Sequence, residues 1–174
     1  MKRLQVTPLP SQEPMVGRWL WAMEEARKRT LELVDGLAQD VVDWEGPDGD
    51  ENAIGSLLYH IAEVEMAWLW WEMKGHSQMP EGVLKDFPHE PVDATGRLAR
   101  VLRVPVEDHV ARLGRSRQVF LKEAQRFSAG FWQTPRLDPE NGAFEATPEW
   151  MLYHLIEHEA AHAAQIASLV RRAS

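Results

Sequence analysis

Histidines are the residues of this chain whose spacing is best suited to chemistry. His154, His158 and His162 follow one another at intervals of four. Side chains four residues apart lie on one face of an α-helix, so two neighbouring imidazoles can converge on one divalent ion. The first and last of these histidines would be roughly 12 Å apart along a helix, too far for one ion to bind all three. The segment therefore offers two overlapping pairs, and a further ligand has to come from elsewhere.

The other histidines are the candidates for that further ligand. His76 and His89 lie in a proline-rich segment, where we expect them at the surface, and His109 stands in a polar context beside two acidic residues. Only His60 lies among apolar residues in the middle of a predicted helix, where an unpaired imidazole would be costly to bury. A metal bond would remove that cost, so His60 is the favoured partner of a histidine pair.

Each of these signals also has an explanation without a metal. A histidine pair can be part of a solvated helix face, and a single histidine in a helix can be a hydrogen-bonded core residue. Residues 158–162 also match the His-Glu-x-x-His motif, in which Glu159 would be the general base of a metalloprotease. The chain shows no strand-rich domain and no downstream glutamate helix to complete such a site. Glu157 and Glu159 flank His158 but point away from its face of the helix, so we expect both to be solvated.

Composition and charge limit the remaining chemistry. The 174 residues include 27 acidic and 19 basic ones, and the formal net charge of −8 argues against a nucleic-acid-binding surface. No cysteine is present, which excludes disulfides, thiolate ligands and a cysteine nucleophile. Any thiol used in a reaction must come from outside. The sequence lacks an uncharged apolar run of about 18 residues and a secretory signal. We expect a cytoplasmic protein without a membrane span.

Hydrophobic periodicity predicts the helices that must position the histidines. We expect residues 1–13 to form a loose tail and residues 14–174 to form a single domain. On the first helix, Arg27 is expected on the wet side. The expected helices cover residues 14–38, 50–74, 105–127 and 148–172.

Residues at the expected helix ends support these boundaries. Asp50 or Asn52 can cap the second helix, and Gly75 can adopt the left-handed conformation that closes it. Thr147 and Pro148 are suited to the cap and first turn of the last helix.

These elements predict an all-α fold, a four-helix bundle with a long crossover between helices two and three. Residues 75–104 contain several prolines and are expected to cross the bundle, so that helices two and three run parallel. The other two connections are expected to join antiparallel neighbours. We also expect a weak helix over Asp93–Leu102 and a short hairpin within residues 131–146.

A tryptophan cluster predicts a contact outside the core. Trp68, Trp70 and Trp71 lie within four residues of one helix, so they cannot all face inward. At least one should meet a loop, a ligand or a partner subunit, and we expect a homodimer formed through bundle faces.

Two segments resemble the signatures of the DinB/YfiT-like family of bundle proteins. Asn52-Ala-Ile-Gly-Ser-Leu-Leu-Tyr-His-Ile-Ala-Glu-Val-Glu65 is similar to the second-helix signature of the family. His158-x-x-x-His162-x-x-Gln165-Ile166 is similar to the fourth-helix signature. The resemblance extends over about residues 14–172, including the order of helices and the long crossover.

The resemblance implies a ligand set for a divalent metal. In this family one histidine of the second helix and two of the fourth hold the metal, which corresponds to His60, His158 and His162. His154 would then lie outside the ligand set, one turn towards the start of the helix. Many relatives have a histidine just before the last ligand and an arginine-glycine pair after it. Here these positions are alanines: Ala161, Ala163 and Ala164.

Two further polar residues are expected beside the ligands. Gln165 follows His162 by three residues, and Glu63 follows His60 by three. Each could therefore hydrogen-bond a ligand histidine without binding the metal itself. Ordinary polar contacts within the bundle are the alternative for both.

The resemblance also implies a class of reaction. Characterised members of the wider superfamily include transferases and isomerases that use a low-molecular-weight thiol such as bacillithiol or mycothiol. We therefore expect the transfer of such a thiol onto a small electrophile, with zinc or nickel as the first candidate metals and manganese as a third. The alternatives are a metal-dependent hydrolase and a non-enzymatic, stress-linked binding or assembly module.

Overall fold

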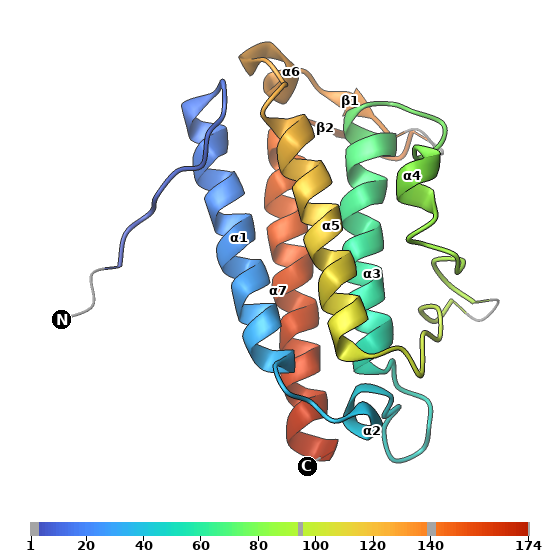
Figure 1. The fold of residues 1–174 in the computed structure, drawn as a ribbon. Helices are drawn as coiled ribbons and strands as arrows, with labels where there is room; N and C mark the ends of the chain where they lie inside the picture. The colour runs from blue at the N-terminus through green and yellow to red at the C-terminus, as the bar shows by residue number, and fades with distance from the viewer. Residues whose placement is uncertain (1–3, 94–95, 139–141, 174) are drawn as a thin grey trace.

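The computed structural model describes residues 4–93, 96–138 and 142–173 and confirms the all-α class. Four long helices form a bundle (Figure 1): α1 (Pro14–Val34), α3 (Ile54–Ala67), α5 (Val106–Ala124) and α7 (Pro148–Ala173). Three short helices lie in the connections: α2 (Gln39–Val42), α4 (Glu81–Leu84) and α6 (Ala129–Gln133). No helix of the described residues is both long enough and apolar enough to cross a membrane.

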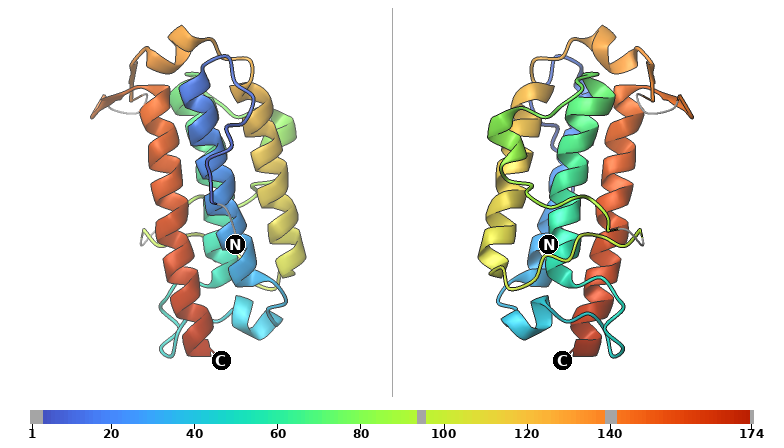
Figure 2. Two further views of the ribbon diagram at one scale, coloured as in Figure 1. Left: turned by 90° about the vertical axis from the view of Figure 1, so that its left-hand side faces the viewer. Right: turned by 90° about the vertical axis from the view of Figure 1, so that its right-hand side faces the viewer.

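The direction of the helices follows from the long crossover. In Figure 1, α3 and α5 both run upward, whereas α1 and α7 run downward. The crossover carries α4 and then passes along α3 back to the other end of the bundle (Figure 2). The predicted parallel arrangement of α3 and α5 is confirmed.

The neighbours in the bundle differ from the prediction. Helix α1 packs mainly on α7 and α3 mainly on α5, while α3–α7 and α1–α5 contacts close the ring. Figure 2 shows α7 and α5 on either side of α1, with α3 behind. Helices joined by the first and third connections are therefore diagonal partners, and the expectation of antiparallel neighbours is wrong. Each of these connections is long enough to cross an end of the bundle.

Helix ends agree with some of the expected signals. Helix α1 stops at Val34, before the expected end, and α3 begins after Ala53 without a side-chain cap, so the predicted cap by Asp50 or Asn52 is wrong. Helix α3 continues into a π-helical turn, η1 (Trp68–Met73), and Gly75 follows with a φ of 66°. At the start of α7, Thr147 Oγ1 accepts a hydrogen bond from the Trp150 amide at 3.2 Å, which confirms that cap.

The connections contain little regular structure. The expected hairpin is confirmed by β1 (Arg136–Leu137), which pairs antiparallel with β2 (Glu145–Ala146). The expected helix over Asp93–Leu102 is not formed by its described residues, and Leu98 instead forms an antiparallel bridge with Val92, just before that range. Residues 94–95 of that prediction lie outside the described residues. Before α1, the described tail residues form no helix, and the Leu9 amide donates to the Gly17 carbonyl at 2.9 Å.

Charged side chains from all four long helices meet inside the bundle. Arg27 of α1 donates to Glu159 of α7 at 2.6 Å and to Glu65 of α3 at 2.7 Å. Arg117 of α5 donates to both carboxylate oxygens of Glu65, at 2.8 and 3.1 Å, and to Glu159 at 3.2 Å. These side chains are at most 6% exposed. We call Arg27, Glu65, Arg117 and Glu159 the buried charge network.

The buried charge network corrects two expectations. Arg27 and Glu159 were both predicted on solvated faces, but each is buried because opposite charges from other helices surround it. Burial alone would raise the pKa of Glu65, yet Arg117 and Arg27 outweigh that effect and the pKa is lowered. A buried charge needs such compensation, since an unpaired one is costly.

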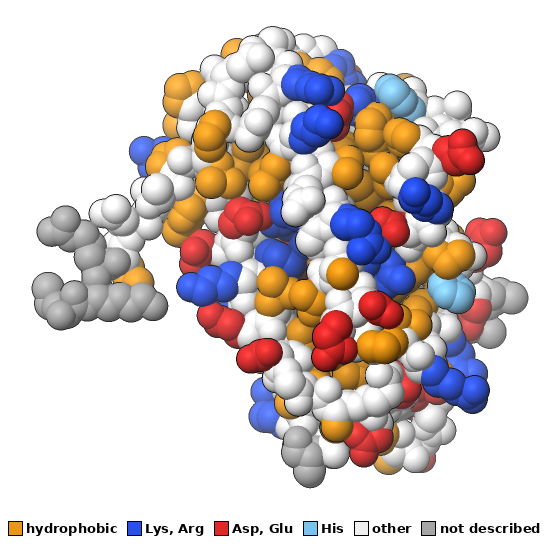
Figure 3. Space-filling model, viewed as in Figure 1, with side chains coloured by type: hydrophobic (Ala, Val, Ile, Leu, Met, Phe, Trp, Pro, Cys, Tyr) orange, Lys and Arg blue, Asp and Glu red, His pale blue; other side chains and the backbone are white. Residues whose placement is uncertain are grey.

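The outer surface is mixed in charge. On the face shown in Figure 3, acidic and basic side chains alternate, with apolar side chains between them. A hollow of about 620 Å³ lies between α1 and α5, lined in part by Leu31, Val34 and Val110. The histidines of the candidate site are not among its lining residues.

Candidate metal centre

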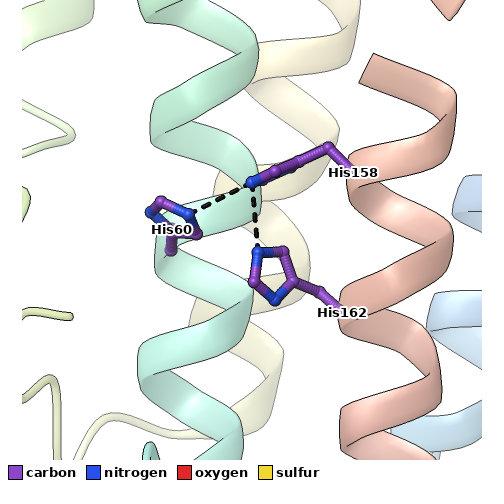
Figure 4. Close-up of side chains that lie close together, drawn as sticks. All are labelled: His60, His158 and His162. Atoms are coloured by element: carbon purple, nitrogen blue, oxygen red, sulfur yellow. Dashed lines mark hydrogen bonds between the residues drawn. The ribbon is translucent and has the colours of Figure 1, made fainter. Parts of the chain in front are cut away.

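Three imidazoles from two helices face one another at the α3–α7 contact (Figure 4). His158 Nε2 lies 3.1 Å from His60 Nε2 and 3.1 Å from His162 Nε2. One ligand atom of each residue lies within 4.8 Å of those of the other two. We call His60, His158 and His162 the histidine cluster. All three are partly buried, so a ligand can reach the cluster from one side.

Helix geometry explains why these rings meet. His158 and His162 are one turn apart on α7, and their ring centroids are 4.4 Å apart. His60 comes from the antiparallel helix α3, and its ring centroid is 5.0 Å from each of the other two. Because α3 and α7 are neighbours in the ring of helices, one residue of α3 can face a pair on α7.

Burial favours the neutral form of two cluster histidines, His60 and His158. It lowers the pKa of His60 to about 4, with a smaller effect from His162. Burial also lowers the pKa of His158 to about 3, and the neighbouring imidazoles add to this shift. A neutral imidazole has one N–H and one lone pair, so three Nε2 atoms that face one another cannot all be satisfied by hydrogen bonds among themselves.

The donor set fits a divalent metal. Bonds of about 2.0–2.1 Å to a tetrahedral zinc ion place two nitrogens about 3.3 Å apart. The 3.1 Å separations between the Nε2 atoms are close to that spacing. The histidine cluster could therefore hold a metal ion with little rearrangement of its side chains.

The outer nitrogens of two cluster histidines differ in their surroundings. His162 Nδ1 lies 2.9 Å from Gln165 Oε1, so a proton on Nδ1 would leave the Nε2 lone pair facing the cluster. His60 Nδ1 is buried and has no hydrogen-bond partner among the described residues. One turn along α3, Glu63 Oε2 is also buried and without a partner there. Burial, with a contribution from Glu90, raises the pKa of Glu63 to about 7.

The fourth histidine of α3 and α7, His154, lies outside the cluster. Its ring centroid is 6.1 Å from that of His158, towards the start of α7. The ring lies 4.5 Å from Trp68 and 5.5 Å from Trp150, measured between centroids. Burial lowers the pKa of His154. The structure brings the other three candidate ligands together and leaves this one among aromatic rings.

The remaining histidines do not contribute to the cluster. His76 and His89 are exposed, as expected. His109 has a charged neighbour in Arg112, in keeping with its polar sequence context, but it is buried, with 1% of its surface exposed. Its Nδ1 is 3.2 Å from Arg112 Nη1, and burial followed by Arg112 lowers its pKa to about 4. Gly55 makes room for this ring, because a Cβ there would lie 3.0 Å from His109 Nε2.

The metalloprotease alternative does not fit the structure. Glu159, the would-be general base, is turned into the bundle and binds Arg27 and Arg117. Its neighbour Glu157 is exposed, as expected, and accepts a hydrogen bond from Tyr153 at 3.3 Å. The carboxylate in the motif thus belongs to the buried charge network and not to the histidine cluster.

Some residues around the site were missed at the sequence level. Phe144, in the loop before β2, stacks on Trp68 with 6.1 Å between ring centroids. Trp68 is therefore the member of the tryptophan cluster that contacts a loop, as predicted. Trp70 is buried and Trp71 is partly buried. The signal that could have found the buried charge network was Glu65, an acidic residue within the most apolar helix of the bundle.

The same fold occurs in known proteins. A model of the DinB superfamily matches residues 22–166. YkkA of Bacillus subtilis (strain 168), an uncharacterized protein, is 26% identical over 159 residues, which cover 90% of this chain and 86% of that protein. The solved structure of YfiT from Bacillus subtilis is described as a probable metal-dependent hydrolase with an unusual four-helix bundle topology. It matches with a TM-score of 0.64 at 16% identity, over 97% of this chain and 93% of YfiT.

Proposed function

Since the chain belongs to the DinB superfamily, we propose that it is a metal-dependent enzyme whose ion is held by His60, His158 and His162. The reaction we propose is the transfer of a low-molecular-weight thiol, of the bacillithiol type, onto a small electrophile. One observation carries the metal site: three Nε2 atoms from two helices face a common point at the spacing of metal ligands.

The chemistry follows from the donor set and from the composition. Three neutral imidazoles would leave a divalent ion its full charge, which suits Lewis-acid activation of a thiol or a water molecule. Imidazole favours zinc or nickel, with manganese as a third candidate. The chain has no cysteine, so the thiol would be a second substrate supplied from outside.

Residues next to the cluster would position the ligands. Gln165 holds His162 through its outer nitrogen, which fixes the ring and its tautomer. Glu63 lies one turn after His60 on α3, and its carboxylate is buried. We propose that this carboxylate accepts a hydrogen bond from His60 Nδ1, as Gln165 would from His162 Nδ1. His154 supports the edge of the site through its contacts with Trp68 and Trp150.

Space for a small substrate exists beside the cluster. A hollow of about 360 Å³ lies between the C-terminal part of α7 and the start of α3. Gln165, which binds His162, and Leu57, one turn before His60, both line it, together with polar groups such as Ser168 and Arg97. Its mixed lining suits a small molecule with polar groups.

Two alternatives differ in what the site would bind. A metal-dependent hydrolase would activate water in place of a thiol, and the description of YfiT as a probable metal-dependent hydrolase favours this alternative. A non-enzymatic binding or assembly module would have no open metal position. Structural zinc sites normally have four protein ligands, whereas this cluster has three among the described residues.

A metal analysis followed by a thiol titration separates these functions. After reconstitution with zinc or nickel, we expect about one ion per chain in the wild type and in the control His89→Ala, whose histidine is exposed. Bacillithiol should then bind and react with electrophiles such as 1-chloro-2,4-dinitrobenzene. Metal without thiol binding would favour the hydrolase, and absence of metal would favour the module. Light scattering on the same samples tests the predicted homodimer.

A further inference from the structure

Aromatic rings extend from the histidine cluster towards the start of α7. His154 lies one turn before His158 and contacts two tryptophans, with centroid distances of 4.5 Å to Trp68 and 5.5 Å to Trp150, which are themselves 6.4 Å apart. The rings of His154 and Trp150 are nearly parallel, at 6°. Phe144 stacks on Trp68 at 16°. We call Trp68, Phe144, Trp150 and His154 the aromatic wall.

The aromatic wall is built from three different elements. Trp68 is the first residue of the π-helical turn η1, Phe144 directly precedes β2, and Trp150 and His154 come from α7. Single π-helical turns are rare and are frequently found at functional sites. The convergence of these elements next to the histidine cluster places the wall at the edge of the candidate site.

Two of these rings are exposed to a degree that core packing does not explain. Trp150 is 47% exposed and Phe144 is 39% exposed, whereas Trp132 at the same end of the bundle is fully buried. Phe144 and Trp150 line a hollow of about 310 Å³, whose remaining lining includes Thr147. A ring that entered this hollow would gain aromatic contacts that water cannot supply.

From this arrangement, and on the basis of the proposed function, we propose that the electrophilic substrate, and not the thiol, carries a planar apolar group that binds between Phe144 and Trp150. Its reactive end would lie at the histidine cluster. Trp150 precedes His158 by eight residues, which corresponds to about 12 Å along α7. His154 lies between Trp150 and His158 on the same helix, and its ring contacts those of Trp68 and His158. The substrate class is therefore an elongated molecule with an aromatic ring roughly two helical turns from the reacting atoms.

A series of hydroxamates tests this assignment on the zinc-loaded protein. Hydroxamates bind zinc through their head group, so acetohydroxamate measures the metal centre alone, and phenylalkyl hydroxamates of increasing chain length measure the aromatic wall. We expect the longer phenylalkyl compounds to bind about tenfold more tightly than acetohydroxamate, since an added aromatic contact is worth about this factor. Binding is followed by calorimetry and by quenching of tryptophan fluorescence, so no turnover is needed.

Variants locate the gain on the wall. In Phe144→Ser/Trp150→Ser, the affinity ratio between phenylalkyl and acetohydroxamate should fall to about one. Trp21→Ser is the matched control, because Trp21 is a partly buried tryptophan of α1 that lines a different hollow, with Val6 and Met15, and it should keep the ratio. If the double variant does not fold, Trp150→Ser alone provides the same comparison.

The possible results separate this inference from the proposed function. Failure of every hydroxamate to bind would contradict the open metal centre and both proposals with it. Binding of acetohydroxamate without a gain for any phenylalkyl compound would overturn the aromatic site alone. The same holds if the gain survives in the double variant, or if the double variant changes only the oligomeric mass, since the wall would then be a subunit interface.

Discussion

The histidine cluster and the buried charge network both use α3 and α7, and they differ in whether the side chains of the protein satisfy one another. Helix α3 contributes His60 to one and Glu65 to the other, and α7 contributes His158 and Glu159. In the network, two guanidiniums face two carboxylates, and each carboxylate has an arginine partner. In the cluster, three imidazoles face one another, and no acidic or basic side chain of the described residues is part of it.

This contrast indicates what each region does. The network is self-sufficient and ties α3 and α7 to α1 and α5 through Arg27 and Arg117. Consecutive helical residues point about 100° apart, so fixing Glu159 in the core also fixes the direction of His158. The buried charge network therefore holds the histidine cluster in place. The cluster itself lacks a cation to which its ring nitrogens could bind. A metal ion would be such a cation.

The largest effect is expected from breaking the network. Glu159→Ala would leave Arg27 and Arg117 buried with only part of their compensation, and removal of one partner from a buried ion pair costs about 3–5 kcal/mol. The control Glu157→Ala removes the exposed neighbouring carboxylate and should change stability by less than about 0.5 kcal/mol. Urea denaturation without metal measures both. Equal losses in the two variants would contradict the structural role of the network.

Breaking the histidine cluster should strongly lower metal affinity and only weakly lower the stability of the metal-free protein. His158→Ala removes the ring that contacts both other histidines, so we expect metal affinity to fall by more than about 100-fold. This loss exceeds the one expected for residues that only hydrogen-bond a ligand histidine. Stability of the metal-free protein should fall far less than in Glu159→Ala. The control is His154→Ala, one turn away and outside the cluster. Competition with a chelator measures the affinities, and an equal loss in both variants would speak against this ligand set.

A smaller effect is expected from the residues that hold the outer nitrogens. Gln165→Ala and Glu63→Ala should each weaken metal binding by about 10–100-fold, because such partners orient a ligand histidine. Glu63→Gln keeps an acceptor and should lose less than Glu63→Ala. The same chelator competition applies. An unchanged affinity in Glu63→Ala would assign this carboxylate an ordinary structural role.

Acid sensitivity sharpens the comparison further. The pKa of His158 is about 3 in the folded protein and about 6.5 when unfolded, so the unfolded chain binds more protons in this interval. The contribution of His158 to stability is therefore complete above about pH 6.5 and is lost progressively as the pH falls towards 3. In His158→Gln this loss is absent. We expect the urea midpoint of the metal-free wild type to fall towards that of His158→Gln between pH 7 and pH 4.5. An equal difference between the two midpoints at both pH values would contradict a neutral, buried His158.

Patterns that depend on one helix were predictable from the sequence, and those that depend on pairs of helices were less so. Periodicity gave four helices, and Thr147 and Gly75 marked two of their ends, because these signals are local. The diagonal order of helices was not predictable in this way. It depends on which faces meet across the bundle, and a long connection permits either a neighbour or a diagonal partner.

The candidate site shows the same division. The spacing of His158 and His162 predicted that their rings would be adjacent, but spacing alone did not distinguish this pair from His154 and His158. The family resemblance pointed to the pair that the structure brings to His60. Burial of Glu159 and His109 was missed because it depends on distant parts of the chain: Arg27 and Arg117 surround Glu159, and Gly55 of α3 packs against His109.

X-ray absorption at the metal edge of the reconstituted protein tests the central claim most directly. We predict three imidazole nitrogens at about 2.0–2.1 Å from a bound zinc ion in the wild type, and a loss of this signature in His60→Ala. A wild-type spectrum with fewer than three imidazole ligands, or one that His60→Ala leaves unchanged, would contradict a shared site between α3 and α7.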